Sequence, residues 1–526
     1  MSSMTSRVTQ LPEGLPLSKL LDVLPTARLR AGSSEPDGVL VCGVHHDSRA
    51  VEPGDLFVAR AGAKTDGSAF ITQAIARGAV ALLLRAGTQA PAGIPVLEVE
   101  DVPRSLAFAA DAVYGHPTAA LKVVGITGTN GKTTTSQLVR ACLDAQGART
   151  GVVGTLGNRF ESLDLPSAFT SPEADELARV AALMLARGAT HLVMEVSSIA
   201  LAAARAEAVR FAVAAFTNLT QDHLDYHGSM EAYAAAKARL FSDLGPGAAA
   251  FNVADPFGEE LSRRFRATGR PLLRFSASPG ASAREAEVRL LALDHRAQGL
   301  DLDVETPRGR ARLRSPLLGL HNASNLLTAL SIAMLLDIEP QAAADALSVS
   351  MQVPGRLERC DDRALDDVVV LVDYAHTPDA LARVLESVRS LARETGGRTL
   401  CVFGCGGDRD PGKRPQMGEA VGRGADLSIV TNDNPRSEDP AAIADAILPG
   451  LRAAGATFEV ELDRARAIER AVVEARPGDV VLIAGKGHEP YQIVGAQTFA
   501  FDDREHARLA LASRRSRRPG HEGGAG

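Results

Sequence analysis

The sequence predicts an α/β protein of three domains: a small mixed α/β N-terminal domain, a central P-loop ATPase-like domain on a parallel sheet, and a C-terminal Rossmann-like domain. Three observations support this fold class. The chain has 526 residues, which is too many for one hydrophobic core. Apolar strand patterns alternate with helical patterns in two successive stretches, as in doubly wound sheets. A Gly- and Thr-rich loop joins a predicted strand to a predicted helix at residues 125–135.

The N-terminal domain is expected at residues 1–118. Apolar runs at 55–59 and 79–84 predict short buried strands. The segment YGHPTAA at 114–120 is rich in turn residues and predicts the link to the central domain. The first residues, MSSMTSRVTQLPEG, contain no apolar run followed by a cleavage site, so secretion is not expected.

The central domain is expected at residues 119–353. KVVGIT predicts a strand that leads through the loop into a helix at 132–145. Further apolar strands are predicted at 191–198, 211–219 and 247–255, with Ala-rich helical stretches between them, and an apolar helix at 324–337 closes the domain. This alternation indicates a largely parallel sheet.

The C-terminal domain is expected at residues 354–512. Apolar strands are predicted at 368–375, 399–407, 427–433 and 479–487, again with helices between them, which indicates a second doubly wound sheet. Residues 513–526 are basic and then Gly-rich, and we expect them to form a disordered tail.

Composition narrows the class of protein. The net charge of -7 and the pI of about 6.0 argue against a nucleic-acid binder, which usually carries a basic face. No apolar run is long enough for membrane insertion. The five cysteines are scattered and odd in number, which fits the reducing cytoplasm. Cys401 and Cys405 lie beside an apolar strand and are expected to be core thiols rather than zinc ligands.

The loop GITGTNGKTTT at 125–135 predicts phosphate binding. Backbone N–H groups of such a turn point at phosphate oxygens, Lys132 can reach the terminal phosphates, and the Thr133 hydroxyl can ligate Mg²⁺. Ile126 stands where the strict Walker spacing requires its first glycine. The loop alone is compatible with any nucleotide hydrolase or transferase. The expected ATP-binding residues here are Gly128, Thr129, Asn130, Gly131, Lys132, Thr133 and Thr134.

With GTNGKTT the sequence resembles the Mur ligase family, to which the folylpolyglutamate synthases are related, and the resemblance extends through all three domains. It implies an ATP-dependent ligase of the acid–D-amino-acid type that serves peptidoglycan synthesis in the cytoplasm. The implied reaction adds meso-diaminopimelate to UDP-N-acetylmuramoyl-L-alanyl-D-glutamate through an acyl phosphate, with Mg²⁺ as cofactor and ATP as co-substrate.

The expected catalytic and metal-binding groups follow two of the predicted strands. Glu195, at the end of the strand at 191–198, offers the oxygen ligand that Mg²⁺ prefers. The resemblance implies that His223 contacts a second metal. It also implies that Lys237 is carbamylated, which turns a cation into an oxygen ligand. Carbamylation requires a neutral amine, so burial or nearby cations must lower the pKa of this lysine. The catalytic set is Lys132, Glu195, His223 and Lys237, and the metal ligands are Thr133, Glu195, His223 and carbamylated Lys237.

The resemblance also implies the residues that contact the two nucleotides. Ser48 falls at the uridine pocket, and residues 63–65 form a loop beside it. Arg49 is a neighbour of the pyrophosphate or a surface residue. Many relatives have histidine at the position of Ile199 and some have glutamine at the position of Ala203, so details of dipeptide binding depart from the family pattern. ATP is expected to be closed in by Asn322, Arg356, Asp373 and His376, with Asn325 and Tyr374 nearby. The UDP substrate is expected to contact His46, Ser48, Thr170, Ser171, Ser197 and Arg205.

The incoming amino acid is expected to bind in the C-terminal domain. The segment DNPR at 433–436 is, by resemblance, the form found in diaminopimelate-adding members of the family. The expected acceptor residues are Arg409, Asp433, Asn434, Pro435, Arg436, Gly485 and Glu489. Two rival functions remain: a folylpolyglutamate synthase, which lacks the uridine-binding domain, and a regulatory P-loop protein that hydrolyses ATP without an amine acceptor.

Overall fold

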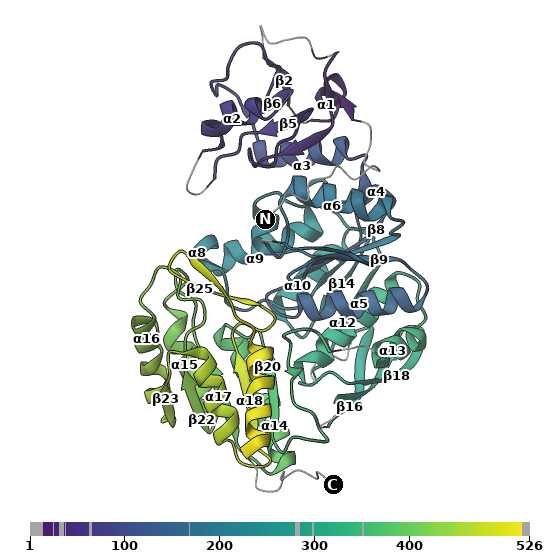
Figure 1. Cartoon of the computed structure of the whole chain (residues 1–526). Helices are drawn as coiled ribbons and strands as arrows, with labels where there is room; N and C mark the ends of the chain where they lie inside the picture. Colours follow the sequence, from purple (N-terminus) through teal and green to yellow (C-terminus); the bar gives the residue numbers. More distant parts are fainter. Residues whose placement is uncertain are drawn as a thin grey trace, which may run out of the picture.

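The protein folds into three sheet-centred units, which follow one another in the computed structural model from the purple N-terminal part to the yellow C-terminal part (Figure 1). The structure describes residues 14–24, 26–30, 36, 38–62, 66–167, 169–278, 285–296, 299–349 and 352–517. Within these ranges no helix is long and apolar enough to cross a membrane.

The N-terminal unit is a five-stranded sheet in the order β2-β7-β6-β5-β4. Its central strands are parallel and mostly apolar, and the runs at 55–59 and 79–84 predict two of them. Helix α3 begins at Val102, and the carboxylate of the N-cap residue Asp101 accepts from the N–H of Arg104. The strands are β1 (Leu15–Pro16), β2 (Arg28–Leu29), β3 (Leu40–Val41), β4 (Gly43–His45), β5 (Asp55–Val58), β6 (Ala81–Arg85) and β7 (Val96–Val99), and the helices are α1 (Leu17–Val23), η1 (Gly67–Phe70), α2 (Ile71–Ala76) and α3 (Val102–Val113).

The central unit contains an eleven-stranded sheet in the order β11-β10-β9-β12-β8-β13-β14-β15-β16-β17-β18. The strands from β9 to β16 are parallel, whereas β10–β11 and β17–β18 extend the two edges as antiparallel pairs. The sequence predicts the parallel strands of this sheet, but it does not predict the antiparallel strands at its two edges. The strands are β8 (Lys122–Thr127), β9 (Thr150–Gly154), β10 (Gly157–Phe160), β11 (Leu163–Leu165), β12 (His191–Glu195), β13 (Phe211–Phe216), β14 (Ala248–Asn252), β15 (Leu272–Ser276), β16 (Val288–Arg296), β17 (Gly299–Thr306) and β18 (Gly309–Ser315).

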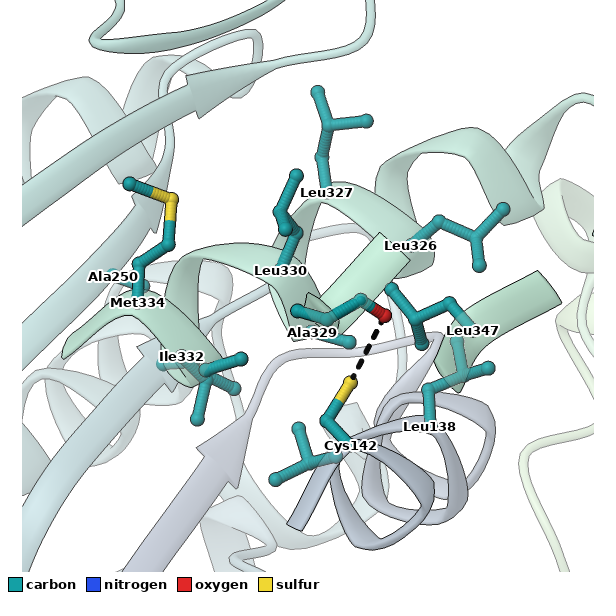
Figure 2. Packing of buried hydrophobic residues seen from close by; sticks show 14 of the residues in the cluster. Leu138, Cys142, Ala250, Leu326, Leu327, Ala329, Leu330, Ile332, Met334 and Leu347 are labelled. Atoms are coloured by element: carbon teal, nitrogen blue, oxygen red, sulfur yellow. Dashed lines mark hydrogen bonds between the residues drawn. The ribbon is translucent and has the colours of Figure 1, made fainter. Parts of the chain in front are cut away.

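Helices cover both faces of this sheet. Helix α12 is apolar on nearly all sides because it is buried between the sheet, α5 and α13 (Figure 2). Leu138 and Cys142 of α5 face Leu326, Ala329 and Leu330 in this core. The helices are α4 (Pro117–Ala120), α5 (Lys132–Ala145), α6 (Ala174–Ala186), α7 (Ser198–Ala202), α8 (Leu224–His227), α9 (Met230–Ser242), α10 (Pro256–Arg266), α12 (His321–Leu335) and α13 (Pro340–Val349).

The C-terminal unit is a six-stranded sheet in the order β19-β20-β24-β21-β22-β23, with a separate β25–β26 hairpin. All its pairs are parallel except β19–β20. Cys401 and Cys405 are buried in its core, as predicted. The strands are β19 (Glu358–Arg359), β20 (Val369–Asp373), β21 (Thr399–Phe403), β22 (Leu427–Val430), β23 (Phe458–Val460), β24 (Val480–Ala484), β25 (Tyr491–Val494) and β26 (Gln497–Ala500), and the helices are α14 (Pro378–Thr395), α15 (Lys413–Gly424), α16 (Pro440–Ala453), α17 (Arg464–Glu474) and α18 (Asp503–Arg517).

One buried ion pair connects the last two helices to this sheet. Arg464 of α17 and Asp503 of α18 are both fully buried, with Nη2 and Oδ2 2.7 Å apart. The same guanidinium donates to the carbonyls of Asn432 and Ala484, just after β22 and at the end of β24. The last helix is therefore tied to the carboxyl ends of two strands.

The prediction that disorder begins at residue 513 is wrong for residues 513–517, which complete α18. Arg514 pairs with Asp367 and donates to the carbonyls of Val472, Val473 and Ala475, which end α17. Arg515 pairs with Asp366 at 2.6 Å. These arginines have partners far away in the sequence, so composition could not reveal them. Residues 518–526 lie outside the described ranges.

Candidate functional site

The phosphate loop lies between β8 and α5, and helix α5 begins at Lys132 as the sequence predicts. Gly131 has φ 88°, and a Cβ there would lie 2.3 Å from Asn325 Oδ1, so only glycine lets the start of α12 pack against the loop. The Lys132 ammonium donates to the carbonyls of Gly128 and Thr129, both at 2.8 Å. Burial lowers the pKa of Lys132. The loop thus presents the N-terminus of a helix and a neighbouring ammonium, which together suit a phosphate chain.

A hydrogen-bonded cluster surrounds the first turn of α5. Thr133 Oγ1 donates to Glu195 Oε2 at 2.9 Å and accepts from Arg356 Nη2 at 3.1 Å. Glu195 also accepts from the backbone N–H and hydroxyl of Thr155. Arg356 comes from the C-terminal unit and stacks on Tyr374 with its guanidinium carbon 4.7 Å from the ring centre. The predicted pair of Thr133 and Glu195 is therefore in contact, and an arginine from another domain reaches it.

Lys237 lies beneath the phosphate loop. It is 1% exposed, its Nζ donates to the Gly128 carbonyl at 2.9 Å, and it sits 4.4 Å from the centre of the Tyr233 ring. Burial, and secondarily the charge of Lys132, hold the pKa of Lys237 well below its ordinary value. The hydroxyl oxygen of Tyr233 lies 3.0 Å from Thr129 Oγ1, within hydrogen-bonding distance. A buried amine with a depressed pKa has the neutral form that reaction with CO₂ requires.

One cavity of about 760 Å³ lies between the phosphate loop, α12 and the start of the C-terminal unit. Asn322 lies behind its wall, where its Oδ1 accepts from Asn325 Nδ2 at 2.7 Å. Burial raises the pKa of Asp373 and lowers that of His376 to about 4, so the imidazole is neutral. Predicted ATP residues in the cavity wall are Asn130, Gly131, Thr133, Thr134, Asn325, Arg356, Asp373, Tyr374 and His376.

A second cavity of about 1160 Å³ adjoins the first. Tyr374, His376 and Thr377 line both, so a group bound in one cavity can meet a group bound in the other. The central unit contributes Thr170, Ser197, Arg205 and His223, and the C-terminal unit contributes Arg409, Asp433, Asn434, Arg436, Gly485 and Glu489. Most residues predicted for the dipeptide and for the amino acid therefore surround one space.

The DNPR segment is held in place by the β25–β26 hairpin, which lies beside α8 at this cavity (Figure 1). The backbone of Arg436, with φ 52°, donates to Ile493 O and accepts from Gly495 N. Its Nη1 donates to the Gly407 carbonyl at 2.7 Å. Pro435, within the segment, is buried. Gly485 has φ 117°, and a Cβ there would lie 2.5 Å from Asp433 Oδ2, so glycine is required for the two segments to meet.

An ion-pair chain joins the N-terminal unit to the dipeptide residues. Glu173 pairs with Arg60 and with Arg205, at 2.6 and 2.7 Å. Arg205 Nη1 also donates to the carbonyl of Ser171, whose hydroxyl contacts Ser197. These contacts hold the predicted dipeptide residues in one cluster at the start of α6 and α7.

The predicted uridine residues lie on the N-terminal unit. The His46 ring reaches Asp175 of the central unit, with Nδ1 and Oδ2 2.8 Å apart. Burial opposes the charge on His46, but the hydrogen bond to Asp175 and the negative charge of that carboxylate together raise the pKa of His46. Ser48 donates to Gln73 at 2.8 Å, and Arg49 pairs with Asp47 on the surface. Residues 63–65 lie outside the described ranges, so that loop remains a prediction.

Several side chains of the site are not among those that the sequence predicts. Thr155 bonds to Glu195 and Thr170, Tyr233 lies against Lys237, and Lys486 is buried beside Glu489. Thr155 follows β9 in the turn GTLG, and a Cβ on Gly154 would lie 2.2 Å from Glu195 Oε1. A position at the carboxyl end of a strand was the available signal for Thr155, as it was for Glu195. Nothing in the sequence separates Tyr233 from an ordinary core tyrosine.

The side-chain oxygen atoms of Thr133 and Glu195 are suitable ligands for Mg²⁺. A hydroxyl and a buried carboxylate 2.9 Å apart are oxygen ligands of the kind this ion prefers. Among the described residues, no three His, Cys, Asp or Glu side chains converge as a metal site. Any Mg²⁺ here therefore needs further oxygen atoms, which phosphate groups or a carbamate on Lys237 would supply.

Comparison with known proteins agrees with this architecture across the whole chain. Residues 41–114 match the Mur ligase family catalytic domain, 126–333 the Mur ligase middle domain, and 355–487 the Mur ligase glutamate ligase domain. A UDP-N-acetylmuramoyl-L-alanyl-D-glutamate–2,6-diaminopimelate ligase of Gloeobacter violaceus is 45% identical over 505 residues, covering 96% of this chain and 100% of that protein. The protein of the same name in Geobacter metallireducens is 44% identical over 491 residues, covering 89% and 94%.

A solved structure of a ligase with that name covers 95% of this chain and 99% of its own, with 31% identity and a TM-score of 0.66. The three matched domains follow one another between residues 41 and 487. The chain belongs to the Mur ligase family.

Proposed function

We propose that this chain forms an amide bond between meso-diaminopimelate and UDP-N-acetylmuramoyl-L-alanyl-D-glutamate at the expense of ATP, in the synthesis of peptidoglycan precursors. The observation that carries the proposal is the meeting of the two cavities at Tyr374, His376 and Thr377. A ligase that activates a carboxylate needs the nucleotide and the acceptor amine on either side of one carboxyl group. Two relatives named as ligases of this dipeptide and 2,6-diaminopimelate are 45% and 44% identical to this chain.

The chemistry follows from this arrangement. The glutamyl carboxylate attacks the γ-phosphorus of ATP, ADP leaves, and an acyl phosphate forms. The amine nitrogen of the acceptor then attacks the acyl carbon, phosphate leaves, and the nitrogen loses a proton. Backbone N–H groups of the phosphate loop, with Lys132 and Arg356, stabilise the charge on the transferred phosphoryl group. Arg356 comes from the C-terminal unit, so closure of the domains both completes this site and excludes water.

Mg²⁺ belongs to the proposal as a cofactor that neutralises phosphate charge when bound. Thr133 and Glu195 would hold it, with His223 and a carbamate on Lys237 as the further ligands. The Lys237 amine is suited to carbamylation: its nitrogen forms a bond to the carbon of CO₂ and releases a proton. Burial favours the neutral amine that this step needs.

The proposed acceptor residues offer complementary charges. Arg436, with Arg409 as a second cation, faces the distal carboxylate of meso-diaminopimelate, and Glu489 faces an ammonium group. Arginine forms two parallel hydrogen bonds to a carboxylate, whereas lysine as an acceptor would bring a second cation to the same place. We also propose that the protein acts in the cytoplasm, because its five cysteines are free thiols, as is usual in a reducing compartment.

The test is phosphate release from ATP in the presence of UDP-N-acetylmuramoyl dipeptide and one amine at a time. We expect release and amide formation with meso-diaminopimelate, and little with lysine. Folate and glutamate in place of both substrates test the folylpolyglutamate synthase alternative. ATP hydrolysis that proceeds equally without any amine would instead support the regulatory alternative and refute the proposal.

A further inference from the structure

A fully buried lysine lies behind the acceptor side of the second cavity. Lys486 follows β24 in the segment GKGHE, and its side chain is 0% exposed. Its Nζ donates to Asn434 Oδ1 at 3.1 Å and to Glu489 Oε2 at 3.2 Å. The centre of the Tyr491 ring lies 5.5 Å from the same nitrogen. Lysine is seldom buried unless it is paired, so this position requires an explanation.

The contacts of Lys486 fix the orientation of Asn434. The Oδ1 atom accepts from Lys486 and from the N–H of Ile493 at 2.9 Å. A flipped amide would place its own N–H groups against these two donors, so only one orientation satisfies both. In that orientation Nδ2 donates to Glu489 Oε2 at 3.0 Å. The ammonium of Lys486, together with the N–H of Ile493, thus fixes where the amide of Asn434 points.

Glu489 is held by three donors. Oε2 accepts from Lys486 and Asn434, and Oε1 accepts from the hydroxyl of Tyr374 at 3.3 Å. Burial raises the pKa of Tyr374, so the hydroxyl keeps its proton and remains a donor. A carboxylate has about four acceptor positions, so these donors leave roughly one direction for a ligand. Asn434 and Glu489 line the cavity, whereas Lys486 lies behind them.

We propose that Lys486 is a positioning residue for the amino-acid acceptor. It acts through Asn434 and Glu489, which it holds in the geometry that receives an ammonium group of the acceptor. Its ammonium also pairs with the Glu489 carboxylate while the acceptor is absent and keeps that carboxylate oriented. The inference rests on the proposed function, because it assigns the cavity to an amino acid.

The first test is Lys486→Met, which removes the ammonium and keeps most of the side-chain length. We expect KM for meso-diaminopimelate to rise about tenfold or more, as befits the loss of charge-assisted hydrogen bonds. KM for ATP and for the UDP substrate should stay within about twofold of the wild type. Lys486→Arg, which keeps a cationic donor, should recover part of the loss. An unchanged KM for meso-diaminopimelate in folded Lys486→Met overturns the proposal.

Arg398→Met is the matched control. Arg398 pairs with Asp479, which is 1% exposed, at 2.7 Å at the opposite end of the same sheet. Its loss also leaves a buried carboxylate without its partner, so thermal stability should fall while all KM values stay unchanged. A similar rise of the amine KM in this control would mean that Lys486 acts only through general stability, which refutes the positioning role.

A double variant covers the case in which Lys486→Met fails to fold. Glu489→Gln combined with Lys486→Met carries no unpaired charge at this position. If Lys486 acts through Glu489, the double variant should have nearly the KM for meso-diaminopimelate of Glu489→Gln alone, within about threefold. A further tenfold loss contradicts the coupling. Wild-type protein that does not use meso-diaminopimelate refutes the proposed function instead, so the two failures are distinguishable.

Discussion

Replacing Arg436 by alanine should reduce the use of meso-diaminopimelate sharply and leave ATP and the UDP substrate nearly unaffected. The guanidinium is anchored by Nη1 on the Gly407 carbonyl, and the backbone is fixed by Ile493 and Gly495. It is therefore oriented before an acceptor binds. Loss of a charge pair in a closed site costs about 2–5 kcal/mol. Arg436 is half-buried, so we expect the lower part of that range, about 2–3 kcal/mol, or roughly 30- to 150-fold in kcat/KM.

The assay is kcat/KM for meso-diaminopimelate and for lysine, with wild type, Arg436→Ala and Arg436→Lys. Lysine at 436 restores charge without the planar fork, so it should recover only part of the activity. Arg423→Ala is the matched control, because Arg423 lies on α15 with 72% of its side chain exposed. Arg409 is exposed and should not replace Arg436. A variant within threefold of wild type for meso-diaminopimelate would refute the assignment, as would a wild type that prefers lysine.

Three further predictions concern the other parts of the site. Lys132→Ala should lower ligation about 100-fold or more while the circular dichroism spectrum stays native, and normal ligation would refute the phosphate-loop assignment. Lys237→Ala should lose most activity and regain part of it in formate, which can supply an oxygen ligand; full activity without formate would contradict the carbamate proposal. The raised pKa of His46 and the lowered pKa of Asp175 mean that their pair stabilises the fold between about pH 4 and pH 6.5 and that the contribution is lost as pH rises through the pKa of His46. Urea titration should therefore give His46→Ala an unfolding free energy about 1 kcal/mol below that of the wild type at pH 5.5, and nearly the same value as the wild type at pH 8.5. Equal differences at the two pH values would contradict this.

Sequence periodicity predicted the parallel strands and the helix that starts at Lys132, because buried parallel strands are continuous apolar runs between turn residues. The antiparallel edge strands are not predicted, although the sequence of β17, GLDLDVET, alternates apolar and polar residues and its burial alternates in the same way over much of the strand. Alternation of this kind is typical of a strand with one exposed face, and a continuous apolar run is not its signature.

The site is predictable where its residues lie at the carboxyl end of a strand, and much less so where partners come from distant segments. Glu195 is the last residue of β12 and the DNPR segment follows β22, and the sequence predicts both. Thr133 and Arg356 are 223 positions apart, and their contact depends on how two domains pack. A lysine such as Lys486 normally lies on the surface, so only the fold reveals that it is buried.

The buried pair of Arg464 and Asp503 sets a limit on how far the protein can be truncated. Removal of α18 would strip the carboxylate from a guanidinium that has no access to water, at a cost of about 3–5 kcal/mol. The same guanidinium supports the ends of β22 and β24, which lead into Asp433 and Gly485. We therefore expect a shortened protein that lacks residue 503 and those beyond it to bind the acceptor amino acid more weakly, with a smaller effect on nucleotide binding. Tags and fusion partners belong beyond Arg517, where α18 is already complete.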